Sequence, residues 1–312
     1  MELNCPVTIN NIQEALKSYI VDNELKSLVI GVSGGIDSAL CCAIAQPVCG
    51  GLSIPLIGRS LPIISNKEQE IKNANLIGEH FCLDYKESDL SSCFEHFRDT
   101  LGSFGELHPY SPISINGDNN SYSDHILKKK IREGNIKIRE GNIKARLRMI
   151  YLYHLAHLNQ GMVLSTDNKT EEMLGFFTIC GDVGDYAMIQ NLWKTEVYAL
   201  SRYLVMKYSE NKELGKAYAL QSCIDIAPTD GLGISNSDLD QLGVDSYQTV
   251  DDILQEYLEI HETINSDIVT DNKILDKFED LKQNPIIQRY LYTHFKRNWP
   301  NKGLNRCELF NF

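Results

Sequence analysis

The chain has 312 residues, of which 43% are hydrophobic and 23% are charged, a balance typical of a globular protein. Its 30 basic and 42 acidic side chains leave a formal net charge of −12, and the sequence pI is about 5.2. Binding to a polyanionic backbone needs dense Lys and Arg, so this composition disfavours nucleic acid as a partner.

Neither a secretory signal nor a membrane span is predicted. The N-terminal segment lacks the basic and apolar regions of a signal peptide, and no stretch reaches the ~20 apolar residues that a membrane helix needs. The nine cysteines form no C-x-x-C pair, and Cys41 and Cys42 are adjacent. This spacing favours reduced, buried thiols over a disulfide framework or a zinc ribbon. We therefore expect a cytoplasmic protein without a membrane segment.

In the first hundred residues, short apolar runs alternate with segments of helical periodicity. The predicted elements are, in chain order, helix 8–22, strand 25–32, a helix beginning at 39–46, strand 50–57, helix 66–81, strand 81–83 and helix 87–101. The run 25–32 is almost entirely apolar and rich in β-branched residues, which is typical of a strand buried on both faces. Pro55 weakens the second strand, and Asn66 is the expected N-cap of its helix. The alternation predicts an α/β fold with right-handed crossovers.

The segment 102–129 is rich in Gly, Pro, Ser and Asn and lacks periodicity, so we expect a surface excursion there. A direct duplication follows it, because KIREGNI occurs at 130–136 and again at 137–143. Seven residues make two helical turns, so the duplication can lengthen a helix without rotating its face much. The simpler explanation is an insertion tolerated at a solvated helix start. We treat residues of about 102–136 as a surface insertion.

The second half of the chain continues the alternation and ends in helices. The expected elements are helix 144–160, strand 162–166, helix 170–180, a Gly/Asp loop at 181–186, helix 194–208, a loop-rich region at 209–246, and C-terminal helices that include 251–261 and 285–297. No linker is evident, so residues 1–312 are predicted to form one domain with a helical C-terminal part.

The segment SGGIDS at 33–38 lies between a predicted strand and a helix. Tightly turning glycines expose backbone N–H groups at a helix N-terminus, which together form an anion cradle. Ser33 and Ser38 add hydroxyl donors, and Asp37 can hold a Mg²⁺ that bridges phosphates. The segment is neither a Walker A loop nor GxGxxG. A Gly-rich turn with an Asp cap and no function is the alternative.

SGGxDS resembles the signature of the ATP pyrophosphatases, the PP-loop family. Those enzymes cleave ATP between its α and β phosphates and hold the pyrophosphate in this loop. By this resemblance, the expected ATP contacts are Gly31, Val32, Ser33, Gly34, Gly35, Ile36, Asp37 and Ser38.

Other segments resemble the NAD synthetases within that superfamily. They are, in chain order, GNIKARLRM at 141–149, STDNKTE at 165–171, GFFT at 175–178, Gly181-Asp182, LWKT at 192–195, PTDGL at 228–232, SDLDQLG at 237–243 with Tyr247, Val250 and Asp251, and Lys296-Arg297 with Pro300. The resemblance runs in order from about residue 8 to 300, with 102–136 as the main addition. The chain is identified as a member of the NAD synthetase family.

The resemblance implies a doubly wound parallel sheet, Rossmann-like and of the adenine nucleotide alpha hydrolase type, with a helical C-terminal part. It also implies a reaction in which the nicotinate carboxylate of deamido-NAD attacks the α-phosphate of ATP and displaces pyrophosphate. Ammonia then attacks the acyl-adenylate, which gives NAD and AMP. A carboxylate is a poor electrophile, and adenylation provides a good leaving group. Holding two highly charged reactants in line calls for cations and Mg²⁺.

The resemblance also assigns roles to residues. It places Thr166, Lys194 and Thr229 on ATP, Asp37 and Glu171 on Mg²⁺, and Arg146, Asp185, Phe295 and Lys296 on deamido-NAD, with Asp37 and Lys194 as the catalytic pair. Taken alone, Asp37 or Glu171 could equally be a helix-cap acid. Three departures concern deamido-NAD: Ile179 replaces a family lysine, the loop 181–185 is one residue shorter, and either Phe295 replaces a histidine or one residue is inserted after His294.

The remaining expectations concern the nitrogen source, the assembly and the alternatives. The synthetase pattern begins too near the N-terminus for a nitrilase-like glutaminase domain to precede it, so ammonia is the expected donor. The family forms homodimers with deamido-NAD at the interface, where the helix of Arg146 would lie. A tRNA-modifying PP-loop enzyme would need a basic face, and often a cysteine pair. An ATP-binding module without turnover would need neither Glu171 nor Lys194.

Overall fold

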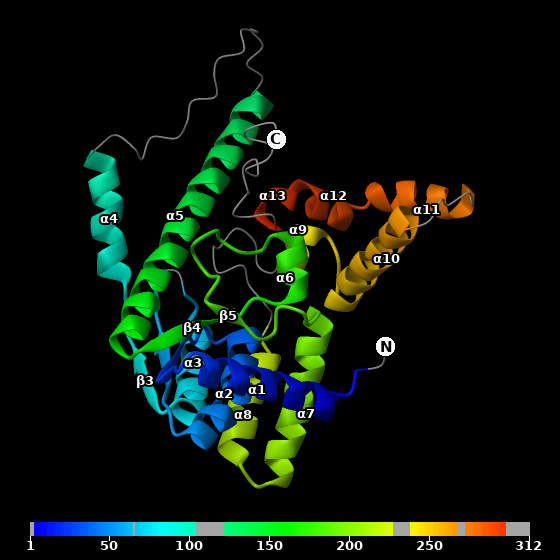
Figure 1. Ribbon diagram of the computed structural model, residues 1–312. Coiled ribbons are helices and arrows are strands. Elements are labelled where there is room, and N and C mark those ends of the chain that lie inside the picture. Colours follow the sequence, from blue (N-terminus) through cyan, green and yellow to red (C-terminus); the bar gives the residue numbers. More distant parts are fainter. Residues whose placement is uncertain (1–2, 65, 104–121, 227–237, 267–271, 298–312) are drawn as a thin grey trace, which may run out of the picture.

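The computed structural model describes residues 3–64, 66–103, 122–226, 238–266 and 272–297 (Figure 1). Its sheet consists of β1 (Ser27–Gly31), β2 (Leu56–Ser60), β3 (Asp84–Glu87), β4 (Gly161–Ser165) and β5 (Tyr186–Ala187). The strands lie in the order β3-β2-β1-β4-β5, and every neighbouring pair is parallel. The predicted parallel α/β sheet is confirmed. Its strand order reverses at β1, and open α/β sheets bind ligands at such a point.

Helices cover both faces of the sheet (Figure 1). One face carries α1 (Cys5–Asp22), α2 (Ile36–Leu52), α3 (Glu68–Phe81), α7 (Lys194–Glu210) and α8 (Leu214–Ile224), and the other carries α4 (Ser91–Ser103) and α5 (Tyr122–Leu158). Successive side chains of β1 alternate between two cores. Leu28 and Ile30 pack against the first group of helices, whereas Val29 packs against α5. A strand buried on both faces explains the unbroken apolar run in its sequence.

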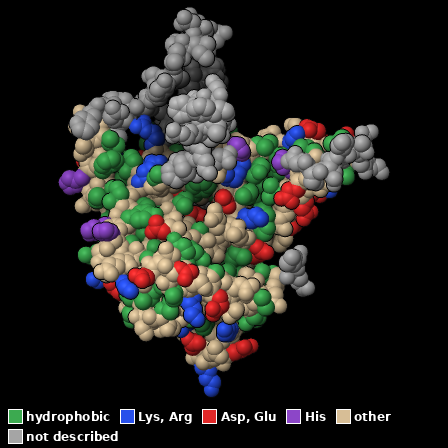
Figure 2. Space-filling model, viewed as in Figure 1, with side chains coloured by type: hydrophobic (Ala, Val, Ile, Leu, Met, Phe, Trp, Pro, Cys, Tyr) green, Lys and Arg blue, Asp and Glu red, His purple; other side chains and the backbone are tan. Residues whose placement is uncertain are grey.

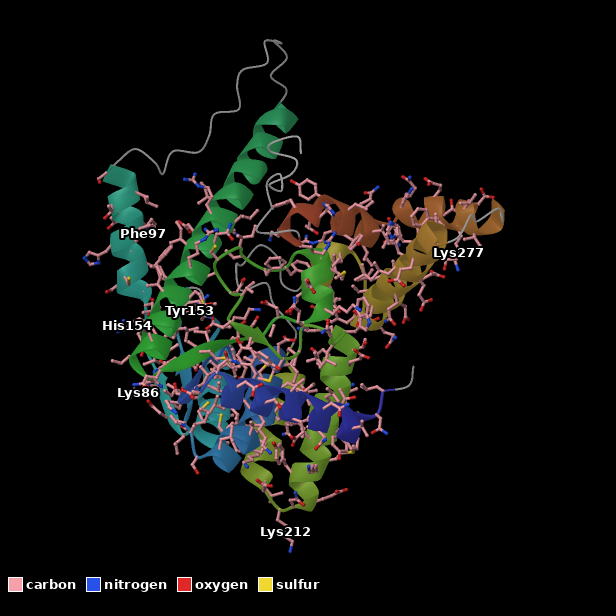
Figure 3. The ribbon with its side chains drawn as sticks, in the orientation of Figure 1. Lys86, Phe97, Tyr153, His154, Lys212 and Lys277 are labelled. Carbon is pink, nitrogen blue, oxygen red and sulfur yellow. The ribbon has the colours of Figure 1, made fainter. Side chains whose placement is uncertain are left out.

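The C-terminal helices form a second apolar cluster. Residues of α9 (Asp238–Leu242), α10 (Tyr247–Ser266), α11 (Asn272–Lys282) and α12 (Pro285–Tyr292), together with α6 (Lys169–Leu174), form the cluster, and α13 (His294–Arg297) follows α12. Lys212, in the turn between α7 and α8, lies at the end of the molecule away from this group (Figure 3). The site described below lies where this cluster meets the sheet.

Two predicted strands begin later in the chain than expected. Helix α2 continues through Pro47 to Leu52, so residues 50–52 are helical. Proline has no N–H, and the Ala43 carbonyl that would accept it instead accepts the Tyr208 hydroxyl at 3.4 Å. Phe81 is the last residue of α3 and is buried in the core, so the strand predicted at 81–83 begins at Asp84.

Three helix predictions also need correction. The N-cap of α3 is Lys67, and the amide oxygen of Asn66 instead accepts the Ile63 N–H at 2.9 Å. The helix predicted at 170–180 ends at Leu174, because Gly175 adopts a left-handed φ of 65°. The region 209–246, predicted to be loop-rich, contains the whole of α8.

The predicted surface insertion is partly helical. Helix α5 begins at Tyr122, inside the segment expected to be irregular, and it contains both copies of KIREGNI. Residues 104–121 lie outside the described residues. Among the residues described, no helix is both long and apolar enough to cross a membrane. Figure 2 shows basic and acidic side chains scattered over the face in view, with no single basic patch.

Candidate active site

A pocket of about 340 Å³ lies at the carboxyl ends of β1 and β4, where the strand order reverses. Its walls include the whole predicted phosphate loop, residues 31–38, together with Thr166, Glu171 and Lys194. The structure therefore brings together nearly all residues predicted to contact ATP or Mg²⁺. Thr229, the remaining one, lies outside the described residues.

The phosphate loop is shaped by one glycine and two serines. Gly34 has a φ of 83°, and a Cβ there would lie 2.0 Å from the Glu70 carbonyl oxygen, so only glycine fits. The Ser33 and Ser38 hydroxyls lie 3.0 Å apart, and each also bonds to the loop backbone. The loop thus leads directly into the N-terminus of α2, where the helix dipole favours an anion.

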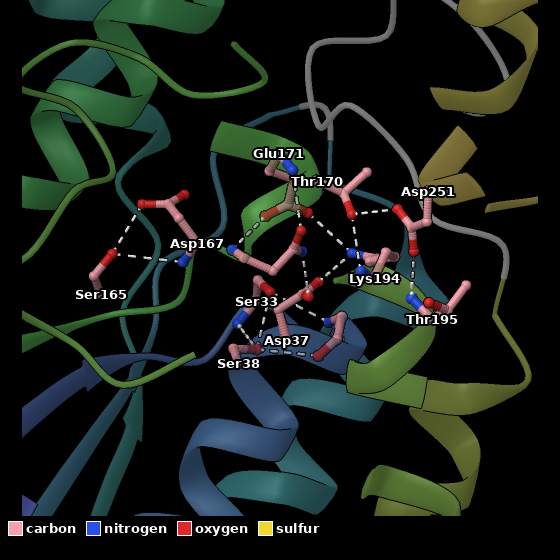
Figure 4. Close-up of polar contacts among 12 residues, drawn as sticks. Ser33, Asp37, Ser38, Ser165, Asp167, Thr170, Glu171, Lys194, Thr195 and Asp251 are labelled. Atoms are coloured by element: carbon pink, nitrogen blue, oxygen red, sulfur yellow. Dashed lines mark hydrogen bonds and ion pairs between the residues drawn. The ribbon is translucent and has the colours of Figure 1, made fainter. Parts of the chain in front are cut away.

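One lysine and two carboxylates meet beside this loop (Figure 4). Lys194 Nζ lies 2.5 Å from Asp37 Oδ2 and 2.9 Å from Glu171 Oε1, and its side chain is 2% exposed. Asn168 donates to Asp37 Oδ1 at 2.8 Å and also caps α6 by accepting the Glu171 N–H at 3.0 Å. Three segments far apart in sequence therefore place two carboxylates on a single cation.

Burial governs the charges of this cluster. Burial, and then the nearby Asp37, raise the pKa of Glu171 to about 7 against the lowering effect of Lys194. Burial lowers the pKa of Lys194, but Asp37 and Glu171 outweigh that effect and hold it well above its ordinary value. Lys194 therefore stays a cation, the charge needed opposite a polyphosphate.

The same two carboxylates suit a magnesium ion. They already converge on one cation, and Mg²⁺ is usually bound by one or two carboxylates plus substrate phosphates. Within the described residues no group of three His, Cys, Asp or Glu side chains could hold a metal. The donor set thus fits an ion that is completed by a nucleotide's phosphates rather than one caged by protein alone.

A second pair of buried acidic residues, Asp182 and Asp167, lies close to this cluster. Asp182 lines the pocket and accepts the Thr178 N–H with both carboxylate oxygens, at 2.7 and 3.0 Å. Burial raises the pKa of Asp182 to about 6 despite these bonds and the nearby Lys296, Arg146 and Arg148. The pKa of Asp167 is also raised, first by burial and then by Asp182. The native state therefore retains protons here that the unfolded chain releases.

This retention predicts a pH effect on stability. Because the folded pKa of Asp182 exceeds its unfolded value, its contribution to the free energy of unfolding falls as the pH rises between about 4 and 6. Relative to Asp182→Asn, the wild type is expected to lose about 1–3 kcal/mol between pH 4.5 and 7.5. Urea unfolding of both proteins at several pH values, without metal, measures this difference. A difference that does not change with pH would contradict the prediction.

Two residues predicted to bind deamido-NAD, Arg146 and Asp185, lie outside the pocket and bond to other parts of the chain. Arg146 is exposed, and its Nε and Nη2 donate to the Ile179 carbonyl at 3.2 and 3.1 Å, so it contacts the backbone of the residue that replaces the family lysine. Asp185 accepts the Val163 N–H at 2.9 Å and the Tyr153 hydroxyl at 3.0 Å, which joins its loop to β4 and α5. Neither residue lines the pocket.

Of the two predicted deamido-NAD residues in the C-terminal tail, Lys296 bonds to the chain and Phe295 is exposed. Lys296 Nζ donates to the carbonyls of Gly175, at 2.6 Å, and Phe177, just beyond the end of α6. Phe295 is 52% exposed. The tail is thus joined to the segment that follows Glu171, and the binding roles of both residues stay predictions.

Sequence reasoning missed several polar residues around the pocket. Arg148 lines it and donates to the Leu61 carbonyl at 2.8 Å and to Asn66 at 2.9 Å, and it lies in the same motif as Arg146. Asn168 could have been found, because Asn followed three residues later by Glu is the pattern of a capping box. Asp251 contacts Thr170 and Thr195, a contact that no local pattern predicts.

Comparison with known proteins supports this picture. The family model described as NAD synthase matches residues 8–300. The NH(3)-dependent NAD(+) synthetase of Methanococcoides burtonii is 31% identical over 235 residues, which are 75% of this chain and 73% of that protein. The enzyme of the same name from Thermoplasma acidophilum is 29% identical over 296 residues, covering 94% and 95%.

Two solved structures share the fold. NMN synthetase from Francisella tularensis superposes with a TM-score of 0.65 at 23% identity, covering 97% of this chain and 98% of that one. NH3-dependent NAD synthetase from Campylobacter jejuni gives a TM-score of 0.57 at 19% identity, covering 94% and 96%. At these identities, the two structures show the fold alone. With the family match over residues 8–300, this chain belongs to the NAD synthase family of carbon–nitrogen ligases.

Proposed function

We propose that this protein converts deamido-NAD to NAD, using ATP and ammonia, through an adenylated carboxylate, with release of AMP and pyrophosphate. The observation that carries the proposal is the convergence of Asp37, Glu171 and Lys194 beside the SGGIDS loop. The names of its relatives support ammonia as the nitrogen donor.

In this reaction the loop and Lys194 act on the phosphates of ATP. The N-terminus of α2 and the Ser33 and Ser38 hydroxyls favour the negative charge of the departing pyrophosphate. Lys194 is held in place and nearly excluded from water, so its positive charge is weakly screened. It would therefore stabilise the negative charge that develops on the phosphates during the reaction. Thr166, directly after β4, lines the same pocket and is a proposed contact for the nucleotide.

Magnesium would be held by Asp37 and Glu171 together with the phosphates. When bound, it would neutralise phosphate charge and orient the α-phosphate for in-line attack. Asn168 donates to Asp37 at 2.8 Å and so orients this carboxylate, whether its partner is Lys194 or Mg²⁺.

The nicotinate end of the substrate is assigned to α5 and the C-terminal tail. Arg146, Asp185, Phe295 and Lys296 are the proposed contacts, and Arg146 is exposed on α5 beside the 179–182 loop. We propose that a second copy of the chain completes this end of the site in a homodimer. Exposed apolar side chains on α5, Ile150 and Leu158, would suit that contact.

An assay of the purified protein with ATP, Mg²⁺ and deamido-NAD tests the proposal. NAD is expected to form with ammonium as nitrogen donor but not with glutamine. Nicotinate mononucleotide, which lacks the AMP half of deamido-NAD, is the control for substrate size. The absence of NAD with either donor, in protein that binds ATP, would contradict the proposed substrate. Pyrophosphate release that depends on tRNA would support the tRNA-modifying alternative, and ATP binding without pyrophosphate release would support the non-catalytic one.

A further inference from the structure

Helix α7 begins at Lys194, and its first backbone N–H groups are satisfied from outside the helix. The first N–H groups of any helix have no partner within it. Here the Lys194 N–H donates to the Thr170 hydroxyl at 2.8 Å, and the Thr195 N–H donates to Asp251 Oδ2 at 2.9 Å. The backbone from which the Lys194 side chain projects is thus held by α6 and α10.

Thr170 connects these two contacts. Its hydroxyl accepts the Lys194 N–H and donates its own proton to Asp251 Oδ1 at 2.5 Å, so one hydroxyl serves both neighbours (Figure 4). Thr170 also precedes Glu171, whose carboxylate lies 2.9 Å from Lys194 Nζ. The backbone N–H and the ammonium group of Lys194 therefore both bond to side chains in the first turn of α6.

Asp251 belongs to the C-terminal helical cluster, and it is fully buried. Burying a carboxylate costs free energy unless hydrogen bonds satisfy it, and here both oxygens accept one. A carboxylate at the start of α7 also faces the positive end of that helix. Tyr247, one turn earlier on α10, places its ring 5.5 Å from Lys194 Nζ. Two residues of α10 thus lie beside the start of α7: Asp251 accepts the N–H of Thr195, the residue after Lys194, and the Tyr247 ring lies near the Lys194 ammonium group.

We infer that Asp251 and Thr170 are positioning residues for the reaction, which act through Lys194 and touch no substrate themselves. The inference rests on the proposed function for its reaction. Without the Thr170 hydroxyl, the Lys194 N–H loses its hydrogen-bond acceptor, and a displaced lysine loses interactions made in the transition state. Loss of the Thr170 hydroxyl should therefore lower kcat rather than weaken the binding of deamido-NAD.

The test compares three single variants with the wild type. Thr170→Val keeps the volume and removes the hydroxyl, and Thr170→Ser keeps the hydroxyl. Ser201→Ala is the matched control, because Ser201 is equally buried on α7, two turns from Lys194, and its hydroxyl donates to the Val197 carbonyl at 2.8 Å. Melting temperatures, kcat, the KM for deamido-NAD and the Kd for ATP from calorimetry are measured for each.

Thr170→Val is expected to lower kcat about tenfold or more, while the KM for deamido-NAD stays within about twofold. It should also weaken ATP binding. Thr170→Ser should restore kcat to within about threefold of the wild type, and Ser201→Ala should lower the melting temperature without changing kcat. An unchanged kcat in folded Thr170→Val, or an equal loss in Ser201→Ala, would overturn the inference.

Two further results are distinguished. If Thr170→Val does not fold, Asp251→Asn replaces it, since the amide keeps the volume and one acceptor oxygen but loses the charge, and the same split between kcat and KM is expected. If the wild type binds ATP but forms no NAD, the proposed function fails. The positioning role is then judged by ATP affinity, which must be weaker in Thr170→Val than in Ser201→Ala for the inference to stand.

Discussion

Replacing Lys194 by Met is expected to lower the rate of NAD formation by at least about 10²–10³-fold, the range seen when one preorganised electrostatic donor is removed from an active site. The variant loses the only cation that the described residues place within 4 Å of Asp37 or Glu171. Met has a similar length, so packing changes little while the charge is lost. Steady-state assays with saturating ATP and deamido-NAD measure the effect.

The same variant should also be less stable. Two partly buried carboxylates are left without a counter-charge, and breaking a buried pair from one side costs about 3–5 kcal/mol. Millimolar Mg²⁺ should recover part of this loss, because it supplies another cation between the carboxylates. Lys72→Met is the control: Lys72 pairs with Glu68 at 2.7 Å and both side chains are exposed, so the stability should change little. NAD formation by Lys194→Met within about threefold of the wild type would contradict the role assigned to Lys194.

Substituting Gly34 by Ala is the second change expected to have a large effect. The new Cβ would lie 2.0 Å from the Glu70 carbonyl oxygen of α3, and the φ of 83° is strained for any side chain, at about 1–2 kcal/mol. Since a backbone carbonyl cannot rotate away, the loop itself must move. The affinity for ATP should therefore fall together with kcat, because the anion cradle is no longer formed.

Gly50→Ala provides the matched control in the helix that follows the same loop. Nothing lies within 4 Å of a Cβ added at Gly50, inside α2. Alanine there should leave activity unchanged and raise stability by about 0.5–1 kcal/mol, since glycine is unfavourable within a helix. Calorimetric titration with ATP measures the affinity of both variants, and thermal melts measure their stability. An ATP affinity in Gly34→Ala equal to that of the wild type would show that the loop tolerates a Cβ.

The element types were more predictable than their boundaries. The run 25–32 contains a strand because its apolar periodicity is local, and β1 occupies Ser27–Gly31. Residues 50–52 were predicted to begin a strand, but they belong to α2, which continues through Pro47; the Ala43 carbonyl, which Pro47 leaves without a helical donor, accepts the Tyr208 hydroxyl, 165 residues away in sequence. Asn66 did not cap its helix, since its amide bonds to Ile63 and Arg148 instead. Such compensation depends on neighbours that a sequence window does not contain.

Within the candidate site, SGGIDS could be recognised without a structure, because it needs only a strand, a turn and a helix that are adjacent in the chain. The folded chain is needed to see that Asp37 and Glu171 share one buried lysine, and that Asp251 from the C-terminal cluster bonds to the start of α7. The bonds of Asp185 and Lys296 to backbone groups are likewise specified by no motif. Charge, burial and hydrogen bonding between residues far apart in the chain arise only when the sheet order and the helix packing bring those residues together.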